Sequence, residues 1–316
     1  MQGWQLNRTN EPLELVTKPD PEPGPGEVLI GVKAAGLCHT DVGMLHDPGW
    51  MSKISAPVIL GHECAGVVQK IGPEVSGFQV GDRVGVAPLD AKTGKTIGAQ
   101  RDGAYSDVCL VGVDQLIHLP DNVSFEQGAA ATDAGMSSYH PLFKVGGATK
   151  GMKVGIIGVG GLGQFAANMA LIAGCDVSVA DTSAQAREWA RGIGIEKVYE
   201  QITDMAQDDV ELIVDFAGFG STTRDAISAV RSGGLVILVG MGKLEATIDT
   251  GDLIVRNITL RGNNGGTAQD IADVYGYFQT GKMHPTLTAT SFDKIPEGLD
   301  RLEQGAVSGR LIAVRD

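Results

Sequence analysis

Residues 153–181 read KVGIIGVGGLGQFAANMALIAGCDVSVAD and predict a strand, a glycine-rich turn, a helix and a second strand. The apolar run at 154–159 has the composition of a fully buried parallel strand. Gly158, Gly160 and Gly163 then follow in the register G-x-G-x-x-G. In such a turn the first glycine permits the bend, the second admits a pyrophosphate, and the third lets helix and strand pack closely. The stretch is therefore typical of a dinucleotide site at a helix N-terminus.

An acid, Asp181, ends the second expected strand 18 residues after Gly163. A carboxylate at this point accepts hydrogen bonds from the adenosine ribose hydroxyls, and it repels a 2′-phosphate. Residues 182–186 contain no Arg or Lys, and the first cation is Arg187. The pattern therefore favours NAD over NADP. A structural βαβ unit without a ligand is the alternative, and the glycine-rich turns of methyltransferases look similar.

Composition narrows the class of protein. The 316 residues are 43% hydrophobic and 20% charged, and the net charge of −13 argues against a nucleic-acid partner. No apolar run approaches the roughly 18 residues that span a bilayer, and no secretory signal is visible at the N-terminus. We therefore expect no membrane partner and a cytoplasmic location. The cysteines form no C-x-x-C pair and predict no disulfide framework; they are Cys38, Cys64, Cys109 and Cys175.

The pattern of elements changes along the chain. Up to residue 123 it favours short strands separated by glycine and proline turns. Residues 125–144 have helical periodicity, interrupted near 133–135, and strands alternate with helices from residue 153 onward. The predicted fold class is α/β, with a doubly wound parallel Rossmann sheet and an all-β part before it. We expect the C-terminal tail to pack back onto that first part.

A second group of residues suggests a metal site. Cys38, the pair His62-Glu63, and Asp133 carry the sulfur, nitrogen and oxygen donors that catalytic zinc uses. They lie far apart in sequence, so only the fold could bring them together. Spacing alone leaves other interpretations open: a buried apolar cysteine, a core histidine, and an aspartate that caps a helix.

The motifs GLCHTD, GHECAGVV, GDRV, VDFAG and GR begin at residues 36, 61, 81, 214 and 309. With the glycine loop, they make the chain resemble the zinc-dependent alcohol dehydrogenases of the medium-chain dehydrogenase/reductase superfamily. The resemblance implies a GroES-like catalytic domain at residues 1–123, completed by 285–316. It places a Rossmann dinucleotide-binding domain at residues 124–284.

The resemblance also assigns catalytic roles. Cys38 and His62 match the first two ligands of the catalytic zinc, and Glu63 matches the acid that can exchange with water beside it. Asp133 occupies the position of the third ligand, which is often a cysteine. Thr40 matches the hydroxyl that hydrogen-bonds the substrate oxygen and starts a proton relay.

Further matches concern the cofactor. His39 and Arg310 fall where the family places cations near the pyrophosphate, and a surface ion pair is the alternative for Arg310. The glycine loop supplies further contacts, and other backbone segments lie where the nicotinamide and its carboxamide rest. These candidates are Gly158, Gly160, Gly161, Leu162 and Gly163 in the loop, with Ala217, Gly262, Asn263 and Asn264.

Two features depart from the family pattern. Many relatives carry a four-cysteine lobe that binds a structural zinc, but residues 87–103 contain no cysteine, so we expect one catalytic zinc and no structural zinc. The resemblance implies a homo-oligomer, and because that lobe flanks subunit contacts in relatives, its absence leaves both dimer and tetramer open. Gly43 stands where a histidine often completes the proton relay. His46 is a candidate replacement, and a merely solvated histidine is the alternative.

The resemblance implies reversible hydride transfer between NAD and a small alcohol, with an aldehyde or ketone as the oxidised partner. A zinc-free, NADPH-dependent quinone or enoyl reductase of the same superfamily is the alternative among enzymes. A non-catalytic NAD-binding protein with a regulatory or structural role is the alternative from another class.

Overall fold

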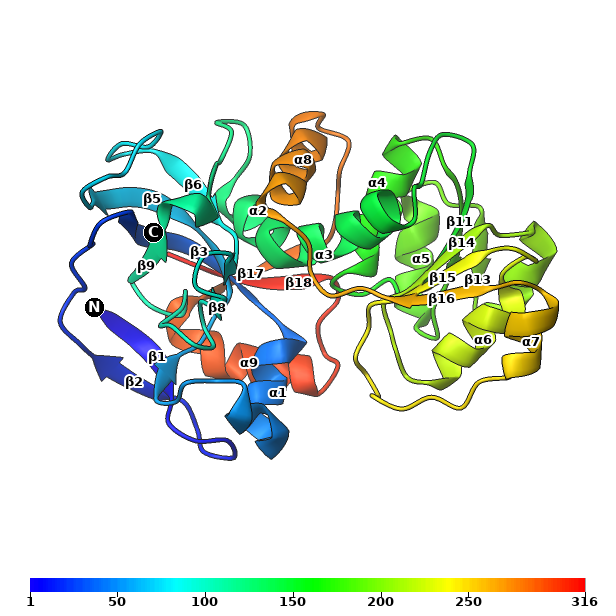
Figure 1. The fold of residues 1–316 in the computed structure, drawn as a ribbon, viewed down its shortest axis with the longest axis horizontal. Helices are drawn as coiled ribbons and strands as arrows, with labels where there is room; N and C mark the ends of the chain where they lie inside the picture. The colour runs from blue at the N-terminus through cyan, green and yellow to red at the C-terminus, as the bar shows by residue number, and fades with distance from the viewer. Residues whose placement is uncertain (316) are drawn as a thin grey trace. The chain divides into compact units, whose positions relative to one another are not determined.

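The computed structural model describes residues 1–315, whose path Figure 1 follows from blue to red. Its contacts divide the chain into two compact units. The N-terminal unit comprises Met1–Asp133, Thr267–Gln279 and Leu287–Asp316, and the central unit comprises Ala134–Gly266 and Thr280–Thr286. The domain boundaries implied by the resemblance, at residues 123 and 285, stay a prediction.

The N-terminal unit is built around the long strand β3 (Glu27–Leu37). This strand pairs antiparallel with β5 (Glu63–Ile71), β9 (Val108–Gly112) and β18 (Arg310–Val314). Because β18 lies beside β3, the tail packs back onto the first part of the chain as expected. The other strands are β1 (Gln2–Leu6), β2 (Glu14–Thr17), β4 (Val58–Ile59), β6 (Arg83–Val86), β7 (Leu89–Asp90), β8 (Lys95–Thr96), β10 (Leu116–His118) and β17 (Leu287–Ser291).

Helices also belong to this mainly β unit. Two of them are α1 (His39–His46), which begins directly after β3, and α9 (Ile295–Glu303), which packs against it. The pattern of short strands expected up to residue 123 did not indicate α1, because the eight residues of this helix include Gly43 and show no marked apolar face. The unit also contains α2 (Phe125–Ala130) and α8 (Ala268–Gln279).

The central unit holds a parallel sheet in the order β13-β12-β11-β14-β15-β16. This order is that of the doubly wound dinucleotide-binding fold, and it confirms the α/β fold class. The strands are β11 (Lys153–Ile157), β12 (Asp176–Ala180), β13 (Lys197–Tyr199), β14 (Leu212–Asp215), β15 (Leu235–Leu238) and β16 (Thr259–Gly262).

Helices connect these parallel strands. α4 (Gly163–Ile172) follows β11 and buries Phe165 and Met169, two residues of the expected apolar face. The other helices of the unit are α3 (Met136–Tyr139), α5 (Ala184–Gly192), α6 (Ser221–Ala229) and α7 (Thr250–Val255).

The expected interruption of the helical stretch near residues 133–135 is confirmed. A π-helical turn at Ala131–Gly135 follows α2, and a second one at His140–Val145 follows α3. Such turns inside helices are frequent at functional sites.

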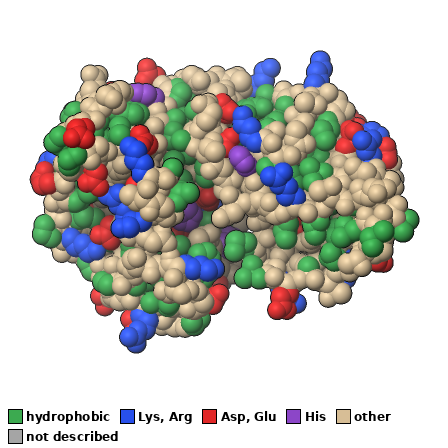
Figure 2. All heavy atoms as spheres, in the orientation of Figure 1, with side chains coloured by type: hydrophobic (Ala, Val, Ile, Leu, Met, Phe, Trp, Pro, Cys, Tyr) green, Lys and Arg blue, Asp and Glu red, His purple; other side chains and the backbone are tan. Residues whose placement is uncertain are grey.

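The distribution of charged side chains on the surface agrees with the net negative charge of the sequence. On the face drawn in Figure 2, Lys and Arg side chains are scattered among Asp and Glu, without a continuous basic area. Within residues 1–315, no helix has the length and apolarity needed to cross a bilayer.

Gly61, just before the candidate metal ligand His62, provides a test of packing. Its φ is +92°, and a Cβ there would lie 2.4 Å from the Tyr105 ring. We expect Gly61→Ala to lower the unfolding free energy by about 2–4 kcal/mol, because backbone strain and overpacking add. Gly77→Ala is the matched control, since its φ is +83° but nothing lies near its Cβ. Equal losses in urea unfolding of the two variants would contradict this account.

Candidate metal and cofactor sites

The four predicted metal ligands lie together in the N-terminal unit. Donor atoms of Cys38, His62, Glu63 and Asp133 all lie within 4.8 Å of one another. Asp133 Oδ2 is 3.6 Å from His62 Nε2 and 3.7 Å from Cys38 Sγ. Cys38, His62 and Glu63 are buried, and Asp133 is partly exposed. The fold therefore brings together residues that the sequence separates by up to 95 positions.

Strand pairing brings the first three ligands together. Cys38 directly follows the last residue of β3, and Glu63 is the first residue of β5. The antiparallel register sets Gly36 opposite Glu63, so the end of β3 lies beside the start of β5. A Cβ on Gly36 would lie 2.0 Å from Glu63 Oε2, so only glycine fits there.

Asp133 comes from the π-helical turn that follows α2. The preceding residue, Thr132, fixes this turn, because its hydroxyl donates to Ala129 O at 2.7 Å and accepts from Cys64 N at 3.3 Å. The helix that follows Asp133, α3, has Gly135 at its N-cap and no side-chain cap hydrogen bond. Capping of that helix therefore does not explain Asp133.

The donor set fits zinc. One thiol, one imidazole and two carboxylates supply the sulfur, nitrogen and oxygen ligands of catalytic zinc sites. With bonds of about 2.0–2.3 Å, donors on a tetrahedron lie roughly 3.3–3.8 Å apart. The distances of 3.6 and 3.7 Å fall in this range. These residues could therefore hold zinc, and their roles as ligands stay a prediction.

Arg310 belongs to the same cluster. Its side chain is buried, Nε donates to Glu63 Oε2 at 3.1 Å, and Nη2 contacts Glu63 Oε1. Nη2 also lies 3.4 Å from Asp133 Oδ2. The ion pair is therefore internal, unlike the surface pair considered from the sequence, and the predicted contact with a pyrophosphate stays a prediction.

The cluster shifts the pKa values of its members. Burial disfavours the charged form of His62, but Asp41 and Asp133 outweigh it and raise the pKa of His62 well above its ordinary value. Burial opposes the Cys38 thiolate, but Arg310 and His62 outweigh it and lower the pKa of Cys38. The cluster thus favours a Cys38 thiolate beside the cationic side chains of Arg310 and His62.

Asp41 is a functional residue that sequence analysis missed. It is fully buried, and its Oδ1 lies 3.2 Å from His62 Nδ1. An acceptor at Nδ1 places the proton there and leaves the Nε2 lone pair for a metal. Its position three residues after Cys38, in the quoted motif GLCHTD, was the available signal.

The remaining catalytic candidates lie along α1. Thr40 and His39 are in its first turn, directly after Cys38. Burial and the nearby Arg310 lower the pKa of His39. His46 is in the last turn, exposed, with Nε2 3.6 Å from Glu303 Oε2. The structure thus places His46 at the opposite end of α1 from Cys38, and its relay role stays a prediction.

The cofactor candidates of the central unit lie at one edge of its sheet. The glycine loop follows β11, Asp181 follows β12, and Ala217 lies two residues beyond β14. Gly262 ends β16, and Asn263 and Asn264 follow it. Parallel strands bind ligands at their carboxyl ends, so these loops form a continuous candidate surface.

The glycine loop has the geometry that a dinucleotide requires. Gly158 has a φ of +80°, and a Cβ on Gly163 would lie 1.8 Å from Gly158 O. Around Gly160, in contrast, a Cβ would meet no atom within 4 Å, which leaves room for a phosphate. Asp181 Oδ2 accepts from Val159 N at 2.8 Å, so the acid also supports the loop.

Asp215 is a second acid that sequence analysis missed. It is fully buried at the end of β14 and accepts from Ala217 N at 3.0 Å and Gly218 N at 2.9 Å. The hydroxyls of Thr222 and Thr223 also donate to it. Asp215 therefore holds the backbone of the Ala217 loop in place.

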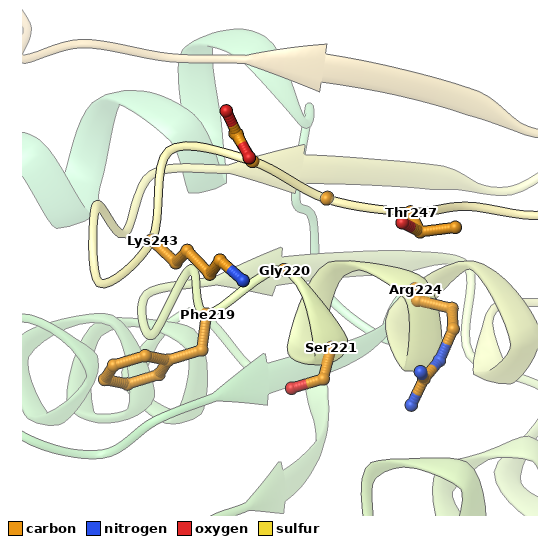
Figure 3. Close-up of a pocket in the computed structure, with 8 residues that line it drawn as sticks. Phe219, Gly220, Ser221, Arg224, Lys243 and Thr247 are labelled. Atoms are coloured by element: carbon orange, nitrogen blue, oxygen red, sulfur yellow. The ribbon is translucent and has the colours of Figure 1, made fainter.

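An open pocket of about 670 Å³ lies on the loops that follow β14 and β15. Figure 3 shows Lys243 directed toward Gly220, and Arg224 directed away. The pocket extends the same edge of the sheet as the cofactor candidates. Its lining residues are Phe219, Gly220, Ser221, Arg224, Lys243, Glu245, Ala246 and Thr247.

The cysteine-free segment at residues 87–103 forms hydrogen bonds and an ion pair. Asp90 accepts from Lys92 N at 2.9 Å and from the Thr93 hydroxyl at 2.8 Å. Arg101 of the same segment forms a 2.7 Å ion pair with Glu27 of β3. Backbone and charge contacts thus order this loop.

Comparisons with known proteins agree with this geometry. Residues 24–121 match the family model of the alcohol dehydrogenase GroES-like domain, and residues 161–279 match that of the zinc-binding dehydrogenases. An alcohol dehydrogenase of Geobacillus stearothermophilus is 30% identical over 99% of both chains. The chain belongs to the alcohol dehydrogenases of the medium-chain dehydrogenase/reductase superfamily.

Other members of the superfamily are similar along their whole length. An alcohol dehydrogenase of Rhizobium meliloti (strain 1021) is 29% identical over 96% of this chain and 95% of its own. The structure of acetophenone reductase from Geotrichum candidum NBRC 4597, solved in complex with NAD, is 31% identical. It superposes with a TM-score of 0.91 over 99% of this chain and 97% of its own.

The raised pKa of His62 predicts how zinc affinity depends on pH. Metal binding needs the neutral ring, so a proton must leave His62. Because the pKa of His62 is raised well above its ordinary value, apparent affinity should still rise with pH where an ordinary histidine has already lost its proton, and should level off once His62 is neutral. We expect about tenfold per pH unit for one released proton. Competition with a chromophoric chelator at several pH values measures this. His46→Asn should show the same slope, and a flat profile in the parent protein would contradict the prediction.

Proposed function

We propose that this dehydrogenase catalyses zinc-dependent, reversible hydride transfer between NAD and a small alcohol, giving an aldehyde or ketone. The observation that carries the proposal is the convergence of Cys38, His62, Glu63 and Asp133 within 4.8 Å. The glycine loop and Asp181 at the edge of a parallel sheet support the cofactor assignment. The printed names of the relatives support alcohols and carbonyl compounds as substrates.

The reaction removes a hydride from carbon and a proton from oxygen, so it yields the carbonyl compound, NADH and one proton. When bound, zinc supplies a Lewis acid that polarises the substrate oxygen, and NAD supplies the hydride acceptor. In this proposal Cys38, His62 and Asp133 hold the metal, and Glu63 exchanges beside it. The Thr40 hydroxyl would accept the proton from the substrate oxygen while it passes its own proton to the cofactor ribose, so the hydroxyl ends unchanged. His46 is proposed as a later member of the relay.

We further propose one zinc per chain. The described residues contain one cluster of His, Cys, Asp and Glu side chains with the spacing of a metal site. The cysteines outside this cluster are buried free thiols: Cys64, Cys109 and Cys175. Free buried thiols also support the proposal of a cytoplasmic location, where thiols stay reduced.

NAD is proposed over NADP. Asp181 would repel a 2′-phosphate. The nearest following cation, Arg187, is already engaged, because its Nη1 donates to the carbonyls of Asp181 and Thr182 and its Nη2 pairs with Glu200 at 2.9 Å. The other proposed cofactor contacts are His39, Arg310 and the candidate residues of the loops that follow β11, β12, β14 and β16.

A homo-oligomer, either dimer or tetramer, is proposed from the resemblance. Exposed apolar side chains in the central unit support it, since large apolar patches on soluble proteins mark interaction sites. The most exposed are Leu244, Ile254 and Val255.

Removing the metal tests the proposed activity. Cys38→Ala should lose bound zinc, and kcat/KM for alcohols should fall on the order of 10³-fold, because the polarising group is lost. Cys175→Ala is the control, since this cysteine lies in the central unit and should leave zinc content unchanged. Metal analysis and NADH formation on a panel of primary, secondary and aryl alcohols measure both effects.

The proposal fails if the parent protein retains activity after complete zinc removal. Turnover of quinones or enones with NADPH by the metal-free protein would instead support a zinc-free reductase. NAD binding without turnover on any alcohol, aldehyde or ketone would support a non-catalytic role.

The cofactor preference has its own test. In Asp181→Asn the side chain keeps its size but loses its charge, so the ribose contact weakens and the repulsion of a 2′-phosphate disappears. We expect kcat/KM with NAD to fall about tenfold, equivalent to one charged hydrogen bond, while kcat/KM with NADP rises. Asp176→Asn, at the start of the same strand, is the control. An unchanged NAD/NADP ratio in Asp181→Asn would argue against the assignment.

A further inference from the structure

Tyr105 is a fully buried tyrosine whose hydroxyl reaches the metal cluster through one intermediary. The hydroxyl donates to Asp41 Oδ2 at 2.7 Å and lies 3.3 Å from Gly36 O. Burial, and then the negative charge of Asp41, raise the pKa of Tyr105 well above its ordinary value, so the hydroxyl keeps its proton and remains a donor.

The Asp41 carboxylate is fixed from both sides. Its Oδ2 accepts from the Tyr105 hydroxyl and from Cys38 N, the latter at 3.1 Å. Its Oδ1 is left for His62 Nδ1 at 3.2 Å. Because two donors hold Oδ2, the carboxylate cannot rotate without breaking buried hydrogen bonds, and Oδ1 stays directed at the histidine.

Tyr105 also holds the backbone that carries His62. Its N donates to Leu60 O at 2.9 Å, and Ala104 N donates to Gly61 O at 2.8 Å. The ring lies so close to Gly61 that a Cβ there would be 2.4 Å from it. The position and the orientation of the His62 ring thus depend on one tyrosine.

We propose that Tyr105 is a positioning residue for the metal ligand His62 and acts through Asp41. The proposal rests on the function proposed above, because it assigns His62 to zinc. The chain Tyr105–Asp41–His62 sets the proton on Nδ1 and directs Nε2 toward Cys38 and Asp133. Outer partners of this kind typically change metal affinity by about 10–100-fold.

The test compares two tyrosine hydroxyls. Tyr105→Phe keeps the ring that packs on Gly61 and removes the hydroxyl, with its bond to Asp41 and its longer contact with Gly36 O. Tyr275→Phe is the matched control: Tyr275 is also fully buried in the N-terminal unit, but its hydroxyl donates to Gly128 O at 3.1 Å and touches no proposed ligand. Both variants lose one buried hydrogen bond, so both should lose thermal stability.

Zinc affinity should differ between the two tyrosine variants. In competition with a chromophoric chelator, Tyr105→Phe should bind zinc about tenfold more weakly than the parent, and Tyr275→Phe should match the parent. The absorption bands of the Co²⁺-substituted protein should change only in Tyr105→Phe. In an Asp41→Asn background, Tyr105→Phe should have little further effect, because the two residues act in one chain.

The outcomes separate this inference from the function that it builds on. A parent protein that binds no zinc would overturn the proposed metal site itself. A parent that binds zinc, with Tyr105→Phe and Tyr275→Phe equal in affinity and in Co²⁺ spectrum, would overturn the role of Tyr105 alone. Additive losses in the Asp41→Asn background would overturn the pathway through Asp41.

Discussion

The N-terminal unit depends on the compensation of negative charge in a buried cluster. Cys38, Glu63 and Asp133 offer donors that bind a metal as anions, and these donors lie within 4.8 Å of one another. Two like charges 4 Å apart repel by about 4 kcal/mol at an effective dielectric constant near 20, so the three could not remain ionised alone. Arg310 supplies a buried, permanent cation against two of them, and His62 supplies a second positive charge until a metal replaces its proton. The candidate ligands can therefore converge only if Arg310 is buried beside them.

Strand register satisfies this requirement. Leu37 is opposite Leu311, and Gly36 is opposite Glu63, so the end of β3 carries Cys38 to the level of both Arg310 and Glu63. A slip of one residue in either pairing would turn these side chains to the other face of the sheet. The C-terminal tail is thus part of the metal cluster, because its strand β18 brings the cation.

How much the sequence could predict depends on how far apart along the chain the interacting residues lie. The glycine loop, α4 and Asp181 are encoded within one short stretch, and periodicity and spacing were enough to place them. The metal ligands come from segments that meet only through sheet pairing, so their convergence required a family resemblance. Asp41 and Tyr105 are joined by a hydrogen bond within the core, and in the sequence Tyr105 lies in a short stretch, GAYSDV, that mixes polar and apolar residues. No local pattern distinguishes a tyrosine that orients a carboxylate from one that only packs.

Gly43 shows how packing limits a proton route. A Cβ at this position would lie 2.9 Å from the indole Nε1 of Trp50, so no larger side chain fits unless the tryptophan moves. Trp50 in turn packs against the core of the unit and carries Lys53 Nζ 4.8 Å from its ring. The missing histidine is therefore not an empty position, since an aromatic side chain fills it. A relay through Thr40, as proposed above, would therefore not run through a side chain at residue 43 unless Trp50 moved.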